Sequence, residues 1–121
     1  MKYMLLIYHD EQAWNAFSEA QRQQTYAEYR ELIQELQSDG KYVAGNQLQA
    51  AATASTVRVR DGEHLVTDGP FAETREQVGG FFIIDANDLE EANRIAARIP
   101  SARMGAIEVR VVVETAAATP A

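Results

Sequence analysis

The feature of this sequence that most constrains its fold is a strand–helix–strand pattern that occurs twice. The first copy has apolar runs over residues 2–9 and 42–45, which flank a helical period over 19–38. The second copy has apolar runs over 78–85 and 106–113, again with a helical period between them. Two such units with antiparallel strand pairing predict an α+β protein with a ferredoxin-like βαββαβ fold.

Both expected helices carry start and stop signals. Ser18 and Gln21 have the spacing of a capping box at the start of the first helix, and Gly40 marks its end. Asp88 and Glu91 have the same spacing before the second helix, which Pro100 should end.

A β-hairpin is expected between the two units. Residues 55–60 alternate with period two, and Asp61-Gly62 before His64–Thr67 predicts a two-residue turn. The hairpin is then an insertion into the ferredoxin-like fold. We expect residues 1–113 to form a single domain, whereas residues 114–121 lack periodicity and are predicted to be a disordered tail.

The expected sheet also predicts an oligomer. Two helices on one face leave the other face of the sheet bare, and an apolar bare face must be buried elsewhere. Residues 4–8, 81–84 and 111–113 are apolar on both alternate faces. A homodimer is therefore expected.

Composition limits the classes of partner. The net charge of −7 over 121 residues argues against nucleic acid and gives no reason to expect a membrane surface. The absence of cysteine excludes disulfides, thiolate nucleophiles and cysteine-ligated metals. The N-terminal apolar run is too short for a signal peptide or a membrane span, so a cytoplasmic location is expected.

The segment Asp68–Thr74 (DGPFAET) is the strongest candidate for a functional loop. Its acidic residue, Gly-Pro turn and aromatic residue precede Gly79-Gly80 and an apolar strand, a pattern that predicts a shaped loop at a sheet edge. Asp68 is a candidate catalytic base, and the alternative is that its carboxylate caps backbone amides of the turn. Gly79-Gly80 within a strand predicts a β-bulge or a close backbone approach.

His9 is a second catalytic candidate, because it ends the first strand. Asp10 and Glu11 follow it, so an oxygen- and nitrogen-ligated metal site is one interpretation. A solvated turn is the favoured one, since no second histidine stands at ligand spacing. No metal or other cofactor is expected.

Tyr8, Tyr29, Phe71 and Glu73 are candidate ligand-pocket residues. The hydroxyls of the two tyrosines are candidate ligand contacts. Tyr29 is expected on the buried face of a helix, where core packing is the commoner role of a tyrosine. Phe71 fits a core or pocket wall, and Glu73 fits a pocket or a solvated surface. These alternatives stay open at the level of the sequence.

The chain resembles the YCII-related family in its DGPF-domain branch. The resemblance is carried by Lys2–Tyr8, Gly45, Asp68–Glu73, Gly79–Phe81 and Pro100–Val111. It implies a dimeric α/β barrel, in which two ferredoxin-like sheets pack face to face around a pocket. Members of this branch are often encoded beside extracytoplasmic-function sigma factors, which implies a regulatory partner.

One departure from the family pattern limits what the resemblance implies. Better-known YCII-type relatives carry a histidine in the first helix and an aspartate before the proline that ends the second. The corresponding positions here hold Tyr29 and Ile99. Two functions therefore stay open: a cofactor-free acid–base enzyme that uses Asp68 with His9 or Tyr29, and a non-catalytic ligand-binding or accessory protein. The substrate is not identified.

Overall fold

The computed structural model describes residues 1–114. The strands are β1 (Lys2–Asp10), β2 (Tyr42–Gln47), β3 (Ser55–Arg60), β4 (Glu63–Asp68), β5 (Glu76–Asp85) and β6 (Ala106–Val111). The helices are α1 (Glu11–Asn15), α2 (Glu19–Ser38) and α3 (Leu89–Ala97), with 3₁₀ turns at Ala51–Thr53 and Pro100–Arg103. Apart from Glu114, the predicted tail lies outside the described residues.

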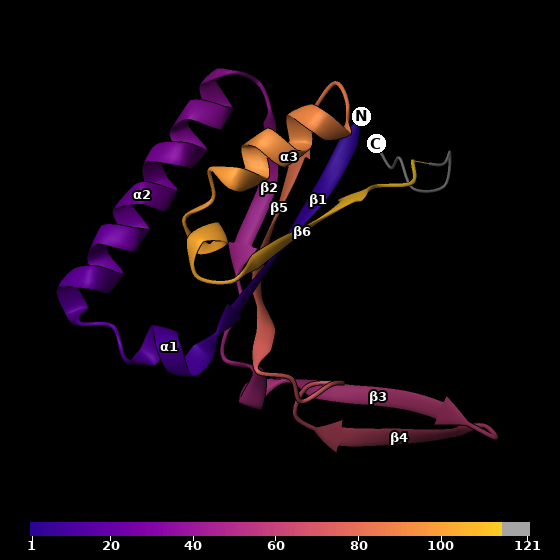
Figure 1. The fold of residues 1–121 in the computed structure, drawn as a ribbon. Coiled ribbons are helices and arrows are strands. Elements are labelled where there is room, and N and C mark those ends of the chain that lie inside the picture. Colours follow the sequence, from indigo (N-terminus) through magenta and orange to yellow (C-terminus); the bar gives the residue numbers. More distant parts are fainter. Residues whose placement is uncertain (115–121) are drawn as a thin grey trace.

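Four of the strands form one antiparallel sheet in the order β2-β5-β1-β6. The helices α2 and α3 cover one face of this sheet (Figure 1). This is the predicted ferredoxin-like arrangement, with β1 and β5 at the centre. Within the described part of the chain, the remaining strands, β3 and β4, pair only with each other.

The core lies between the sheet and the helices. Tyr3, Leu5 and Ile7 of β1 are buried on this face, and they pack with buried residues of β5, α2 and α3. The alternate residues Met4 and Leu6 lie on the opposite face and are half-buried. No helix of residues 1–114 covers that second face (Figure 1).

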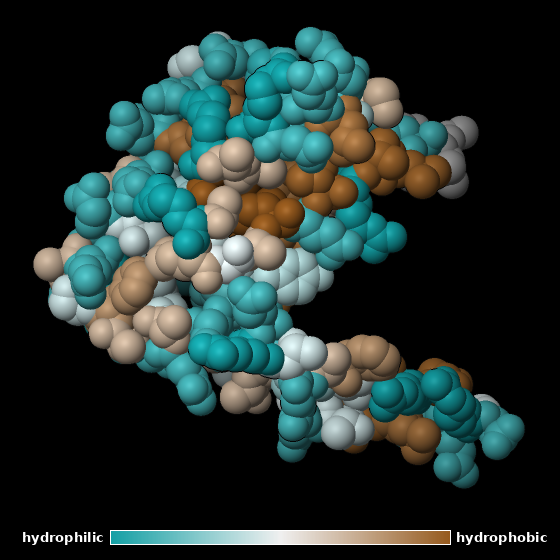
Figure 2. Space-filling view, viewed as in Figure 1, coloured by the Kyte–Doolittle hydropathy of each residue, from teal (hydrophilic) through white to brown (hydrophobic). Residues whose placement is uncertain are grey.

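The inserted hairpin extends away from the sheet (Figure 1), and a recess separates it from the rest of the molecule (Figure 2). Ser55 pairs with Asp68 at its base, and Arg60 pairs with Glu63 beside the turn. Asp61 and Gly62 form the turn with φ of 50° and 78°, which is the left-handed backbone that a type I′ turn requires. The predicted hairpin is confirmed.

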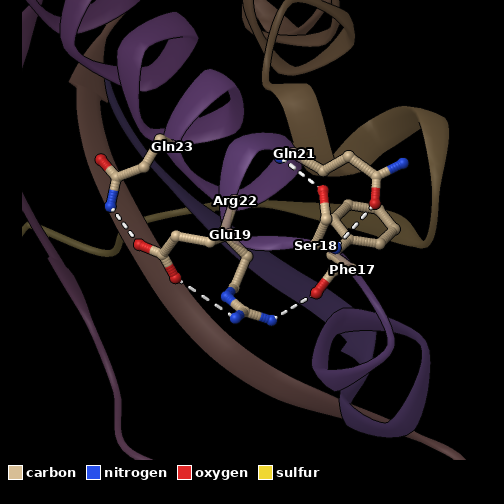
Figure 3. Close-up of polar contacts among 6 residues, drawn as sticks. All are labelled: Phe17, Ser18, Glu19, Gln21, Arg22 and Gln23. Carbon is tan, nitrogen blue, oxygen red and sulfur yellow. Dashed lines mark hydrogen bonds and ion pairs between the residues drawn. The ribbon is translucent and has the colours of Figure 1, made fainter.

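The start of α2 is the predicted capping box (Figure 3). The Ser18 hydroxyl accepts a hydrogen bond from the Gln21 amide at 3.1 Å, and the Gln21 side chain accepts one from the Ser18 amide at 2.8 Å. Glu19 adds an acidic side chain to this first turn, where the helix dipole favours it.

The start and end of α3 differ from the prediction. Asp88 caps the helix by accepting from the Glu91 amide at 2.9 Å, but the Glu91 carboxylate accepts from the Asn87 amide instead of closing a capping box. The helix ends at Ala97, and Ile99 is extended with ψ of 127°. A proline disfavours helical backbone at the residue before it, which explains the earlier end.

The helix α1 was not predicted from the sequence. Asp10 ends β1 and caps α1, because its carboxylate accepts hydrogen bonds from the amides of Gln12 and Ala13 at 2.9 and 3.4 Å. The segment interpreted as a solvated turn is therefore one helical turn, and it brings the ring of Trp14 to 6.5 Å from that of His9, measured between centroids. No helix among residues 1–114 is long and apolar enough to span a membrane.

Candidate functional site

One cavity, called the main cavity because core strands and helices enclose it, lies between α1, α2 and the helix-covered face of the sheet, and its volume is about 380 Å³. This volume is at the lower end of the range of small-molecule sites, about 300–1,000 Å³. The residues that line it are Ile7, His9, Trp14, Tyr26, Tyr29, Arg30, Ile33, Tyr42, Gly45, Asn46, Gln47, Gly79, Gly80, Phe82 and Ser101.

His9 lies in the cavity wall, on the same face of β1 as Ile7 and beside a β-bulge in β5. In the β1–β5 pairing, Ile7 lies opposite Gly80 and Tyr8 lies opposite Val78, so Gly79 is the extra residue. A Cβ atom on Gly79 would collide with the imidazole of His9. The predicted bulge is therefore confirmed, and glycine at position 79 leaves the space that the histidine ring occupies.

Trp14 of α1 forms part of the outer wall of the cavity. Its ring lies 5.6 Å from that of Tyr26 in an edge-on arrangement and 5.5 Å from that of Phe17, measured between centroids. The His9 ring is 6.5 Å away. Aromatic pairs at such distances stabilise their arrangement, so these contacts hold α1 against the start of α2.

Tyr29 and Ser101 form a hydrogen-bonded pair in the cavity wall, with 2.6 Å between their hydroxyl oxygens. Ser101 is buried, and burial raises the pKa of Tyr29, so that its hydroxyl stays protonated near neutral pH. Ser101 comes two residues after Ile99. The chain regions around Tyr29 and Ile99 are thus in contact here, through a tyrosine and a serine.

Asp68 lies outside this cavity. It is exposed at the end of β4 and faces a shallow groove with Glu73, Arg75 and residues of α1. The turn after it has its own hydrogen bonds: the Gly69 amide donates to the Ala54 carbonyl at 2.7 Å, and the Thr56 hydroxyl donates to the Gly69 carbonyl at 2.9 Å. The Asp68 carboxylate takes no part in these bonds, and it does not share a cavity with His9.

The other predicted pocket residues are dispersed. Tyr8 lies on the open face of the sheet, where its hydroxyl donates to Glu108 at 2.8 Å, and this bond raises the pKa of Tyr8. Phe71 is 77% exposed and lies under the guanidinium of Arg58 at 5.1 Å. Of the candidates, His9 and Tyr29 share the main cavity, and Asp68 and Glu73 share the groove.

The side chains after His9 have structural partners. Asp10 forms an ion pair with Arg75 at 2.8 Å in addition to its capping bonds, and this hydrogen bond lowers the pKa of the Asp10 carboxyl. Glu11 accepts a hydrogen bond from the Ala51 amide at 2.7 Å. Within residues 1–114, no three His, Cys, Asp or Glu side chains lie close enough to hold a metal ion.

Several cavity residues were missed from the sequence. Trp14 lies on the short helix α1, which the sequence pattern did not predict, and Ser101 reaches the cavity wall through a contact with Tyr29, 72 positions away in the chain. The spacing of Tyr26, Tyr29, Arg30 and Ile33 puts them on one side of a helix, and this signal could have found the α2 wall.

The fold and the cavity define an α+β protein with a ligand-sized site between one helix layer and the sheet. Residues 1–116 match the family model of the YCII-related domain. A protein from Rhizobium meliloti (strain 1021), described as uncharacterised, is 35% identical over 112 residues, which are 91% of this chain and 90% of that protein. The chain therefore belongs to the YCII-related family.

Proposed function

We propose that this protein binds a small organic molecule in the main cavity and transforms it by acid–base chemistry in which His9 transfers the proton. The observation that carries the proposal is the imidazole of His9 in the wall of a cavity of about 380 Å³, in the space that Gly79 leaves open. Histidine is the side chain most often used to move protons in enzymes. No cofactor is required for this chemistry.

Tyr29 supports the same function as a hydrogen-bond donor. Its hydroxyl stays protonated, and Ser101 holds it in the cavity wall. A protonated hydroxyl stabilises negative charge that develops on a substrate oxygen. In this proposal Asp68 and Glu73 have no part in the chemical step, because they face the separate groove.

The test is a thermal-shift screen of a metabolite library, followed by turnover assays on each compound that binds. We expect His9→Gln to keep ligand binding and lose turnover, and Asp68→Asn to keep both. If His9→Gln turns a bound compound over as fast as the native protein, the proposed role of His9 is wrong. If no compound raises the melting temperature, the cavity is not a binding site.

A non-catalytic role is the second candidate. It is favoured by the absence of carboxylate side chains from the residues that line the cavity, since many acid–base enzymes pair histidine with a carboxylate. In that case the protein senses a small molecule and acts with a regulatory partner such as an extracytoplasmic-function sigma factor. A bound compound that is recovered unchanged, and that alters binding of the protein to such a factor, would favour this role.

We also propose that the protein is a homodimer. The proposal is supported by the apolar residues Met4, Leu6, Phe81 and Ile83, which lie together on the open face of the sheet because Met4 pairs with Ile83 and Leu6 with Phe81. A second copy is the simplest cover for such a face, since a symmetric interface needs only one apolar surface.

A further inference from the structure

The wall of the main cavity has no acidic side chain, in a chain that is acidic overall. The sequence has 18 Asp and Glu residues against 11 Lys and Arg residues. None of the acidic residues lines the cavity, where the ionisable side chains are Arg30, His9 and three tyrosines. A cavity of this composition repels anions less than the rest of the surface does.

Of the residues 1–114 that line the cavity, Arg30 is the only one with a fixed positive charge. Within residues 1–114 it forms no ion pair with an acidic side chain. Other arginines do have acidic partners in this part of the chain, namely Arg22, Arg75, Arg94, Arg98 and Arg103. A guanidinium that is not committed to a carboxylate of its own chain is free to bind the carboxylate of a ligand.

Amide groups lie near this end of the cavity. The side-chain amide of Gln47 donates to the hydroxyl of Tyr26 at 3.4 Å, and Tyr26 is one helical turn before Arg30. Asn46 lines the same cavity. These groups are neutral donors and acceptors, which suit a polar end of a ligand without adding negative charge.

Aromatic rings make up much of the rest of the wall. Phe82 forms edge-to-face pairs with Tyr29 and Tyr42, with ring centroids 6.1 and 5.5 Å apart, and Trp14 of α1 also lines the cavity. Ile33 adds an aliphatic contact. Flat, rigid, apolar walls of this kind favour a planar ligand.

We propose that the cavity takes a small planar carboxylate, with the anionic end at Arg30 and an aromatic or conjugated body among Trp14, Tyr42 and Phe82. The proposal rests on the proposed function, which it deepens by giving the ligand a class. The charge of the ligand is selected by Arg30 together with the absence of acidic side chains, and its shape is selected by the rings.

The test uses three probes of nearly one shape and different charge: benzoate, benzamide and benzamidine, with 2-naphthoate as a larger anion. Calorimetry measures the affinity, and the fluorescence of Trp14, the one tryptophan of the chain, reports whether a probe enters the cavity. We expect one of the two anions to bind about tenfold more tightly than benzamide, as a charge-assisted hydrogen bond predicts, and benzamidine to bind more weakly still.

Arg30→Gln identifies the group responsible. It should weaken binding of the anion about tenfold and leave benzamide unchanged, since it removes charge from an exposed helical position without changing the rings. Arg94→Gln is the matched control, because Arg94 is exposed on α3 and does not line the cavity. That variant should bind every probe as the native protein does.

The remaining outcomes overturn the proposal. If neither anion binds more tightly than benzamide, if benzamidine binds more tightly than the anions, or if Arg30→Gln leaves the anion affinity unchanged, the cavity does not select anions. If neither anion binds but a library compound quenches Trp14, the ligand class is wrong while cavity binding stands. If no compound of either set binds, the proposed function fails as well.

Discussion

Tyr29 is a residue whose role depends on a partner 72 positions away. Its ring contacts Phe82 in the core, while its hydroxyl meets Ser101 in the cavity wall. A buried hydroxyl that loses its partner costs about 1–3 kcal/mol, whereas the net gain from one hydrogen bond is smaller. The pair is therefore expected to behave as a unit in stability measurements.

We predict that Tyr29→Phe and Ser101→Ala each destabilise the protein by about 1–2 kcal/mol, because each variant leaves the hydroxyl of the other residue without its partner. The double variant should cost less than the sum, since it removes both groups of the pair. Urea unfolding of the native protein and the three variants measures this coupling. Additive losses would contradict it.

The lowered pKa of Glu91 predicts that the stability of the protein depends on pH in the acid range. The pKa of its carboxyl is lowered from 4.5 by hydrogen bonds from the Asn87 amide and the Lys41 ammonium group. A carboxyl with a lowered folded-state pKa contributes stability that is present above its unfolded-state pKa and is lost as the pH falls through the folded-state value. We therefore expect stability to decline below about pH 5.

The variant Glu91→Gln removes that titration. Its stability at neutral pH should be lower than that of the native protein, and its decline on acidification should be shallower. Urea unfolding between neutral pH and the acid limit of the folded state measures both slopes. If the free energies of unfolding of the two proteins fall in parallel as the pH is lowered, Glu91 contributes nothing to the loss of stability in acid.

The bulge in β5 is the element that connects the fold to the site. Without Gly79, the alternation of β1 and β5 would continue in register past Ile7, and the space beside His9 would hold a side chain. Gly80 is buried by the backbone of β2, which pairs with it at Gln47. The two glycines therefore have different roles. Gly79 leaves space for the His9 ring, and Gly80 allows the backbone of β2 to pack closely against β5.

Gly79→Ala should displace the His9 ring from the cavity wall. We expect a cost of roughly 1–3 kcal/mol from the added methyl group and a clear change in the NMR signals of the His9 imidazole. Gly62→Ala is the control, because it strains the hairpin turn at a φ of 78° but has no atom within 4 Å of the new Cβ position. Unchanged His9 signals in Gly79→Ala would refute the contact.

At the scale of the whole sheet, residues 1–114 cover one face with helices and leave the other face open (Figure 1). Burying an apolar side chain contributes about 1.5–3 kcal/mol, so the four residues Met4, Leu6, Phe81 and Ile83 offer a considerable gain to an interface that covers them. This gain from burying apolar side chains is the physical reason for the proposed homodimer. A charge introduced into the centre of the face should oppose it.

We expect light scattering of the native protein to give twice the 13.4 kDa of one chain, and Leu6→Glu to give a single chain. Leu89→Glu is the control, since it places the same charge on α3, where Leu89 is 52% exposed on the other side of the sheet. A native monomer, or a Leu6→Glu dimer as stable as the native one, would contradict the proposed interface.

The ferredoxin-like element order, the hairpin turn, the α2 cap and the bulge could all be predicted because each depends on residues close together in the chain. Apolar periodicity, an Asp-Gly pair, a Ser-x-x-Gln spacing and a Gly-Gly pair within a strand are local signals. The family followed from the same sequence, through Asp68–Thr74 and its place between the elements.

The candidate site was decided by the tertiary structure. By residue type alone, Asp68 and His9 are equally good candidates for acid–base chemistry. The fold puts Asp68 in an exposed groove and His9 in the cavity. Ser101 and Trp14 join the site only because a 3₁₀ turn and the short helix α1 pack against α2 and β1. Local signals fix which elements form, whereas a cavity depends on how distant elements pack, and no short-range pattern encodes that.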